Sequence, residues 1–187
     1  MIRTILLCLF IVLLIGMPAY AGIEYLALER TYVVTIEESA TIQKLLEGGH
    51  FDRMNDAITE KAFPIKSYGE LRIKLVRGAE LFPTATSIRT NDLMRKLGKQ
   101  GLVPISAGYL LALGTEYPNL QRSMVIVGLG SVWEQMGTFR EDGHEVQREM
   151  APPLVVYLYG SHVSRTVDLC QFRSTWDPKT IFAVVAK

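Results

Sequence analysis

The chain has 187 residues, of which 20 are Lys or Arg, 19 are Asp or Glu and 49% are hydrophobic. A formal net charge of +1 gives no long-range attraction to phosphate backbones, so the composition disfavours nucleic-acid binding. The apolar content indicates a folded globular domain rather than a disordered tail.

Residues 1–21 have the pattern of a secretory signal peptide. Arg3 supplies a positive charge, residues 5–17 are almost entirely apolar, and Ala19–Ala21 places small residues where a signal peptidase cleaves. The apolar run is shorter than the roughly 20 residues that span a hydrocarbon layer. We therefore expect a mature chain that begins at Gly22 and is secreted or periplasmic. In the alternative, the segment stays uncleaved and is the chain's only tie to a membrane.

In chain order, the first half of residues 22–187 predicts strands and a helix. Residues 32–36 are rich in β-branched side chains and predict a strand, and residues 36–46 have helical spacing. Residues 62–65 are a candidate for a short edge strand. Residues 70–77 alternate apolar and charged side chains, which is typical of an antiparallel strand with one face in water.

Two further helices follow. The first begins near Ser87 or Thr90, either of which could cap it, and ends at Gly98 or Gly101. The next is expected to begin after Ser106 as its N-cap. The expected buried stripes of the two helices contain Leu93, Met94 and Leu97 in the first, and Tyr109, Leu110 and Leu113 in the second.

The remainder of the chain predicts strands. Residues 124–127 are apolar on both faces, which favours a central strand with Ile126 fully buried, and residues 128–133 continue it. Residues 134–149 are polar and predict a loop or a hairpin tip. We therefore expect residues 22–187 to form one α+β domain with a mostly antiparallel sheet and about three helices. The further strand candidates are residues 154–159, 165–172 and 181–185.

No motif indicates a known chemistry. The segment 128–131, Gly-Leu-Gly-Ser, lacks the third Gly of a dinucleotide loop, the Lys of a P-loop and the second Gly of a nucleophile elbow. The histidines are far apart and share no ligand spacing with other side chains. We therefore expect no metal, no cofactor and no catalytic residue. The histidines are His50, His144 and His162.

Cys170 is the one cysteine of residues 22–187, so no disulfide can form within the mature chain. Alternation along the predicted strand places it on the same face as Asp168 and Phe172. This setting favours a small, half-buried packing residue, and we expect Cys170 to be dispensable for activity. Whether the thiol is free or paired with another chain stays open.

Large aromatic side chains gather in the C-terminal half. Tyr157 and Tyr159 are two residues apart and therefore share one face of a strand. An exposed aromatic face suits a sugar ring or a peptide, whereas packing beneath a loop is the structural alternative. The candidate ligand-binding residues are Trp133, Tyr157, Tyr159 and Trp176.

Several short motifs between residues 101 and 187 carry a resemblance. They are Gly101–Pro104, Leu110–Gly114, Tyr117–Arg122, Leu129–Trp133 (Leu-Gly-Ser-Val-Trp) and Phe182–Lys187, which begins Phe-Ala-Val-Val. As a set they resemble a family of short exported bacterial proteins with no assigned activity. The resemblance therefore implies a family and no reaction.

The same region is more distantly similar to C-type-lectin-like domains of the formylglycine-generating-enzyme type. Those domains have a helix, a Leu-Pro-Thr turn, a second helix and two later strands. Here Gly108 and Tyr109 stand in place of an acidic and aromatic pair, and the paired catalytic cysteines are absent, so the resemblance implies a fold and no activity. The matching segments are residues 93–100, 101–106, 109–113, 130–133 and 183–185.

We expect an exported, non-catalytic domain that binds a partner protein or a saccharide. One alternative is an extracytoplasmic enzyme that uses Cys170 or Ser131 with a distant His, or an acid pair such as Asp142 and Glu145. Another is a structural envelope protein without a ligand. An aromatic-lined groove would favour binding, and a deep pocket with converging titratable groups would favour an enzyme.

Overall fold

The computed structural model describes residues 27–141, 144–172 and 175–187. The expected signal peptide and the start at Gly22 lie outside the described residues and stay predictions. In the described part, a large sheet has the strand order β1-β3-β10-β6-β7-β8-β2, with β5 also paired to β10. Its strands are β1 (Thr31–Ile36), β2 (Arg53–Met54), β3 (Gly69–Arg77), β5 (Leu102–Pro104), β6 (Ile126–Glu141), β7 (His144–Ser161), β8 (Ser164–Gln171) and β10 (Ile181–Ala186).

Pairing in the large sheet is mostly antiparallel. The exceptions are β10 with β6 and β2 with β8, which are parallel. A separate pair joins β4 (Ile88–Arg89) to β9 (Thr175–Trp176). The α+β class predicted from the sequence is therefore confirmed. The helical segments are α3 (Ile42–Gly49), α4 (Gly78–Leu81), α5 (Thr90–Lys99), α6 (Ala107–Glu116) and the 3-10 turn η1 (Leu120–Arg122).

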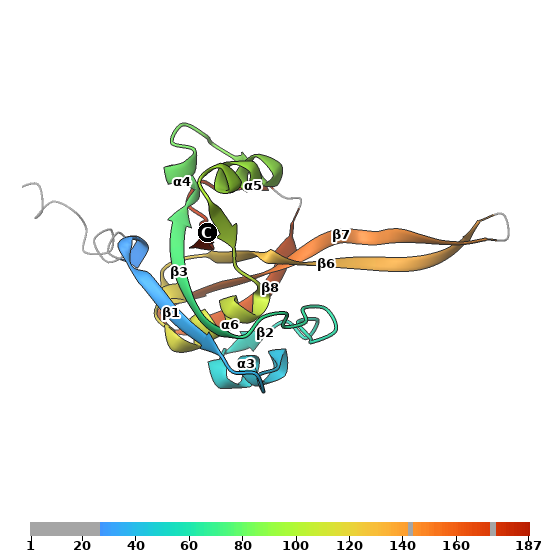
Figure 1. The fold of residues 1–187 in the computed structure, drawn as a ribbon, viewed down its shortest axis with the longest axis horizontal. Coiled ribbons are helices and arrows are strands. Elements are labelled where there is room, and N and C mark those ends of the chain that lie inside the picture. The colour runs from blue at the N-terminus through green and yellow to red at the C-terminus, as the bar shows by residue number, and fades with distance from the viewer. Residues whose placement is uncertain (1–26, 142–143, 173–174) are drawn as a thin grey trace, which may run out of the picture.

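The sheet has a hydrophobic core on each face. Figure 1 shows α4 and α5 on one side of the sheet and α3 and α6 on the other. Ile126 belongs to the first core, with α3 and α6, whereas Val127 belongs to the second, and neither is more than 1% exposed. The predicted central strand covered on both faces is thus confirmed from Ile126 onward. Val125 lies before the strand and is 44% exposed.

The two strands with the clearest alternation are where the sequence predicts them. Residues of β1 alternate between exposed and buried along its whole length. In β3, Ile73 and Leu75 are buried while Arg72 and Lys74 face water. Alternation locates these strands because the side-chain period of a strand is two.

The helix predicted for residues 36–46 begins later in the structure than the sequence pattern indicates. Ile36 continues the alternation of β1 and pairs with Gly69, so sheet pairing holds it in the strand. The helix begins at Ile42 instead, and the Thr41 hydroxyl caps it by accepting the Lys44 amide at 3.2 Å. Residues 62–65 form no strand, and β2 is the edge strand beside β8.

The next two helices differ from expectation in detail. Thr90 begins α5, but its hydroxyl donates to the Phe172 carbonyl rather than capping the helix. Ser106 occupies the N-cap position of α6 as predicted. Residues 107–114 of α6 are all buried, because the helix packs against both α3 and the sheet and has no face in water.

The largest difference concerns residues 134–149, for which polarity predicts a loop or hairpin tip. Here β6 and β7 continue past the body of the protein as a two-stranded antiparallel ribbon, which Figure 1 shows projecting from the domain. Pairing runs from Met136 opposite Glu149 to Glu141 opposite His144. We call residues 134–141 and 144–151 the arm. Of the two predicted alternatives, the loop is wrong and a hairpin is present, but its strands extend far beyond a tip. They are polar because they cover no core.

Candidate functional site

One face of the arm carries an apolar strip, which we define as Phe139, Val146 and Met150. Phe139 lies directly opposite Val146 in the ladder. A Cβ atom added to Gly137 would lie 2.5 Å from Met150 Sδ and 3.2 Å from Phe139 Cε2, so these two side chains cover the glycine. Phe139 is 43% exposed and Met150 is 67% exposed. The arm therefore holds a continuous apolar surface in contact with water.

The opposite face of the arm is acidic. Met136 lies opposite Glu149, and Arg140 lies opposite Glu145. Alternation along β6 places Glu134 on this same face. We call Glu134, Glu145 and Glu149 the acidic face. Met136, 50% exposed, lies among these carboxylates, and Arg140 is the one basic side chain beside them.

Polar contacts between its two strands hold the arm in register. Gln147 Nε2 donates to Thr138 Oγ1 at 2.6 Å, and Arg148 pairs with Glu141 at 2.7 Å. The arm has no third strand in the described residues, so both of its edges are open. An isolated two-stranded hairpin is only marginally stable in water, and open edges with apolar side chains are typical of a surface that binds a partner.

Sequence reasoning missed the arm, although one signal was present. Asp142-Gly143 is a dipeptide favoured in two-residue hairpin turns. Glu141 pairs with His144, which leaves those two residues between the strands. Reading the dipeptide as a turn between two long strands would have predicted a ribbon in place of a loop.

Of the four predicted ligand-binding residues, Tyr157 and Tyr159 lie together. Their rings stack with centroids 5.0 Å apart and planes 10° apart. Both are half-buried, and Tyr157 packs against the second core. Asp168 lies opposite Tyr157 on β8, and its Oδ1 accepts from Asn55 Nδ2 at 2.6 Å. Burial, and then the charge of Asp168, raises the pKa of Tyr157 to about 12, so the phenol stays protonated.

The two tryptophans lie elsewhere. Trp133 packs on the first core, on the other face of the sheet, with its ring edge-on to Phe63 at 6.2 Å. Trp176 is buried in the second core, where its Nε1 donates to Thr90 Oγ1 at 2.9 Å. The structure therefore brings together two of the four predicted residues and assigns the tryptophans to packing.

The candidate nucleophiles are occupied by structural contacts. Ser131 Oγ accepts the Ala107 amide at 3.1 Å, at the start of α6. Its neighbour Gly130 lies against the backbone of Pro104 and Ile105, as expected for a strand that passes close to another. Among the described residues no group of three or more His, Cys, Asp or Glu side chains could hold a metal ion.

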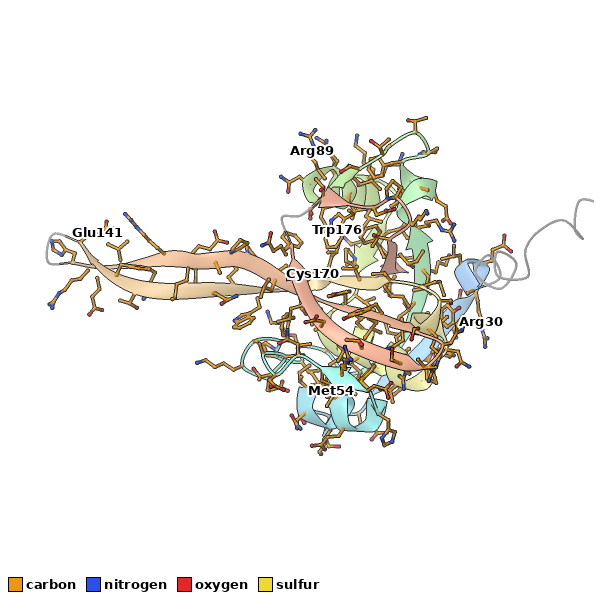
Figure 2. All side chains as sticks on the ribbon, turned by 180° about the vertical axis from the view of Figure 1, so that it is seen from behind. Arg30, Met54, Arg89, Glu141, Cys170 and Trp176 are labelled. Atoms are coloured by element: carbon orange, nitrogen blue, oxygen red, sulfur yellow. The ribbon has the colours of Figure 1, made fainter. Side chains whose placement is uncertain are left out.

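Cys170 lies at the root of the arm (Figure 2) and packs against the second core. Burial, and then the charge of Asp168, raises the pKa of its thiol to about 12. Since the thiolate is the nucleophile, the thiol is unreactive at neutral pH.

We expect Cys170 to react with iodoacetamide at pH 8 at least about a hundredfold more slowly than a free cysteine, because almost none of it is ionised. Mass spectrometry of the native and the urea-unfolded chain measures both rates. The Cys170→Ser variant should fold with an unchanged melting curve. Fast labelling of the native protein would restore the nucleophile hypothesis.

Two hollows on the described part of the body are large enough to be considered as binding sites. One, of about 470 Å³, is lined by residues that include Arg30, Tyr32 and Tyr117, and the Arg30 guanidinium lies 5.7 and 5.8 Å from the two ring centroids. The other, of about 600 Å³, includes Arg89 and Arg95, but both arginines pair with the carboxylate of Asp92. These internal pairings leave neither hollow with convergent free groups for catalysis.

The fold and the arm together define an α+β domain with a projecting β-hairpin. No protein-family model, curated protein or solved structure matches the chain. Within the described ranges, none of the helices is long and apolar enough to cross a membrane.

Proposed function

We propose that the chain is an exported, non-catalytic domain that binds a partner protein through its arm. The observation that carries this proposal is the exposure of Phe139 and Met150, at 43% and 67%, which lie together on one face of the arm and outside either core. Contiguous apolar side chains in water mark interaction sites, since burying them against a partner is favourable. Export is supported by the pattern of residues 1–21.

A protein partner suits the arm better than a saccharide does. The arm offers open strand edges, to which an extended segment of another chain can add by main-chain hydrogen bonds. Tyr157 and Tyr159 are the candidates for stacking against a sugar ring. Each of them already uses one ring face in stacking on the other. The candidates for catalysis make structural contacts instead. Ser131 accepts a hydrogen bond at the start of α6, and Cys170 packs against the second core.

The proposal predicts a partner that contacts the arm. A photo-crosslinking residue at position 139, in the cell that makes the protein, should give a crosslinked product. The same residue at Val33, which is 38% exposed on β1, should give none, because β1 is at the far edge of the sheet. Mass spectrometry identifies the product.

Affinity for the purified partner then tests the apolar strip. The Phe139→Ser/Met150→Ser variant should bind at least about tenfold more weakly, because central apolar side chains supply most interface energy. Val33→Ser is the matched control and should bind like the wild type. Equal crosslinking at positions 139 and 33, or an affinity unchanged in the arm variant, would contradict the proposal.

A further inference from the structure

We propose that the arm's partner is a second copy of this chain, and that the two arms pair edge to edge along β6 in antiparallel directions. This inference rests on the proposed function, because it assigns a partner to the same arm. Two observations carry it. The β6 edge of the arm is open and regular, and its two charges without an ion pair match each other across a two-fold axis.

The two edges of the arm differ in regularity. Ladder partners advance by one residue on β6 but by two on β7 at Met150, which is therefore a bulge in β7. Pro152–Pro153 follow and have no amide N–H to donate. Bulges and prolines blunt an edge against further pairing. By contrast, exposure alternates residue by residue along β6 from 130 to 138, and residues 134–141 contain no proline. The β6 edge is therefore the one suited to a further strand.

This edge is also accessible. In the described residues, β7 is the one strand paired with residues 134–141, because the pairing of β6 with β10 is confined to Ile126 and Val127. Figure 1 shows the arm projecting away from the helices, and Figure 2 shows Glu141 near its far end. A strand of another molecule can therefore lie along the length of the arm.

Two charged side chains of this strand have no ion pair of their own. Glu134 lies where the arm leaves the body and Arg140 lies near its tip, six residues further along β6. Alternation places both on the side of the acidic face. Glu145 lies opposite Arg140 on β7, yet among the described residues neither Glu134 nor Arg140 forms an ion pair. Both charges are therefore available to another molecule.

A two-fold axis at Gly137 brings these charges together. Antiparallel pairing of β6 with its copy then puts Glu134 of each chain directly opposite Arg140 of the other, so that one dimer contains two such pairs. Glu134 and Arg140 are the only charged residues on this face of β6. Each other register that keeps the faces aligned therefore loses the attraction or sets like charges opposite each other.

The β7 edge has no matching pattern. The acids of β7 in the arm, Glu145 and Glu149, share one face, whereas its arginine, Arg148, lies on the other. Antiparallel pairing keeps the faces aligned, so β7 paired with its own copy never sets opposite charges directly opposite each other. Pairing of β6 with β7 of another copy would leave an edge open on each molecule and continue as a filament.

Pairing along β6 also engages the side of the apolar strip. In the register centred on Gly137, Phe139 lies opposite Gln135 of the other copy, so the two strips share one face of a four-stranded ribbon. An isolated hairpin is marginal in water, whereas three or more strands with a hydrophobic face are stable. The second copy therefore supplies the strands that the arm lacks, and it places position 139 within reach of a crosslink between the chains.

Charge exchange tests the pairing. Glu134→Arg makes both positions basic, and Arg140→Glu makes both acidic. Each variant alone should dimerise at least about tenfold more weakly than the wild type, because like charges then lie opposite each other twice in one dimer. The doubly exchanged chain, Glu134→Arg/Arg140→Glu, should dimerise like the wild type. An equimolar mixture of the two single variants should also recover the dimer, because both contacts again join opposite charges.

Analytical ultracentrifugation of the chain, purified from the cell that makes it, measures dimerisation, and circular dichroism checks that each variant is folded. Glu145→Arg is the matched control. It makes the same charge change as Glu134→Arg on the same face, but on β7, and should dimerise like the wild type. The wild-type dimer should weaken between about 0.05 and 0.5 M salt, as expected for exposed charges.

Four results would each overturn the inference: a monomeric wild type, single variants that dimerise normally, a doubly exchanged chain that stays monomeric, or a control as weak as Glu134→Arg. If the wild type is monomeric but position 139 crosslinks to a different protein, the proposed function stands and the second copy is excluded as the partner. If the wild type is monomeric and position 139 gives no product, both proposals fail.

Discussion

Replacing Arg165 with Met is expected to lower the free energy of unfolding by about 3–5 kcal/mol, because it removes two buried hydrogen bonds from a charged donor and leaves both acceptors unpaired. Arg165 is 6% exposed. Its Nη1 donates to the Gly49 carbonyl at 2.7 Å and its Nη2 to the Gly114 carbonyl at 2.5 Å. The side chain therefore joins two helices to the sheet.

The position of the guanidinium explains how a buried charge is tolerated. Gly49 is the last residue of α3, and Gly114 lies in the last turn of α6. The carbonyl ends of both helices carry partial negative charge, which stabilises a cation there. The guanidinium also lies 4.9 Å from the ring centroid of Phe51, a further favourable contact for a cation. Burial, and then the charge of Arg122, lowers the pKa of Arg165, and the charge of Asp52 opposes that effect.

Urea denaturation, monitored by tryptophan fluorescence, measures the free energy of unfolding that the Arg165→Met variant loses. Arg165→Lys keeps the charge but has no planar fork to reach two carbonyls, so its stability should lie between that of the Arg165→Met variant and that of the wild type. The control is Arg72→Ala, on the face of β3 in water, which should change stability by about 0.5 kcal/mol or less. A loss below about 1 kcal/mol for Arg165→Met would show that neither helix depends on the contact.

Truncating Ile126 to Ala is expected to cost about 2–5 kcal/mol through lost apolar burial and the cavity left behind. Ile126 has no exposed surface and begins the central strand β6, between Leu158 of β7 and Ile181 of β10. A loss of this size is a large share of the roughly 5–15 kcal/mol that stabilises a domain.

The neighbouring Val125 provides a matched control for this truncation. It is 44% exposed, so Val125→Ala should change stability by about 0.5 kcal/mol or less. Urea melts of the two variants and of Arg72→Ala make the comparison. If Ile126→Ala is no more destabilising than Arg72→Ala, the position of β6 at the centre of the sheet is wrong.

The sequence by itself determined the elements in which a periodic pattern coincides with a buried face. The alternation in residues 70–77 predicts β3, because a strand with one face in water must alternate. The apolar pair Ile126 and Val127 predicts a strand covered on both faces, since each side chain needs its own core. That Tyr157 and Tyr159 share one face of a strand likewise follows from their spacing of two, whereas the stacking of their rings is seen only in the structure.

Only the tertiary structure decided which faces pack against each other and which strands project from the domain. Trp133 and Trp176 lie in different cores because Trp133 is on β6 of the large sheet, whereas Trp176 is on β9, which pairs with β4, and no local pattern fixes either pairing. Arg165 looks in the sequence like a charge in water, yet it is buried because carbonyls 116 and 51 residues away in the chain converge on it. The arm escaped prediction because hydrophobic periodicity reports burial, and a ribbon in water buries neither of its faces.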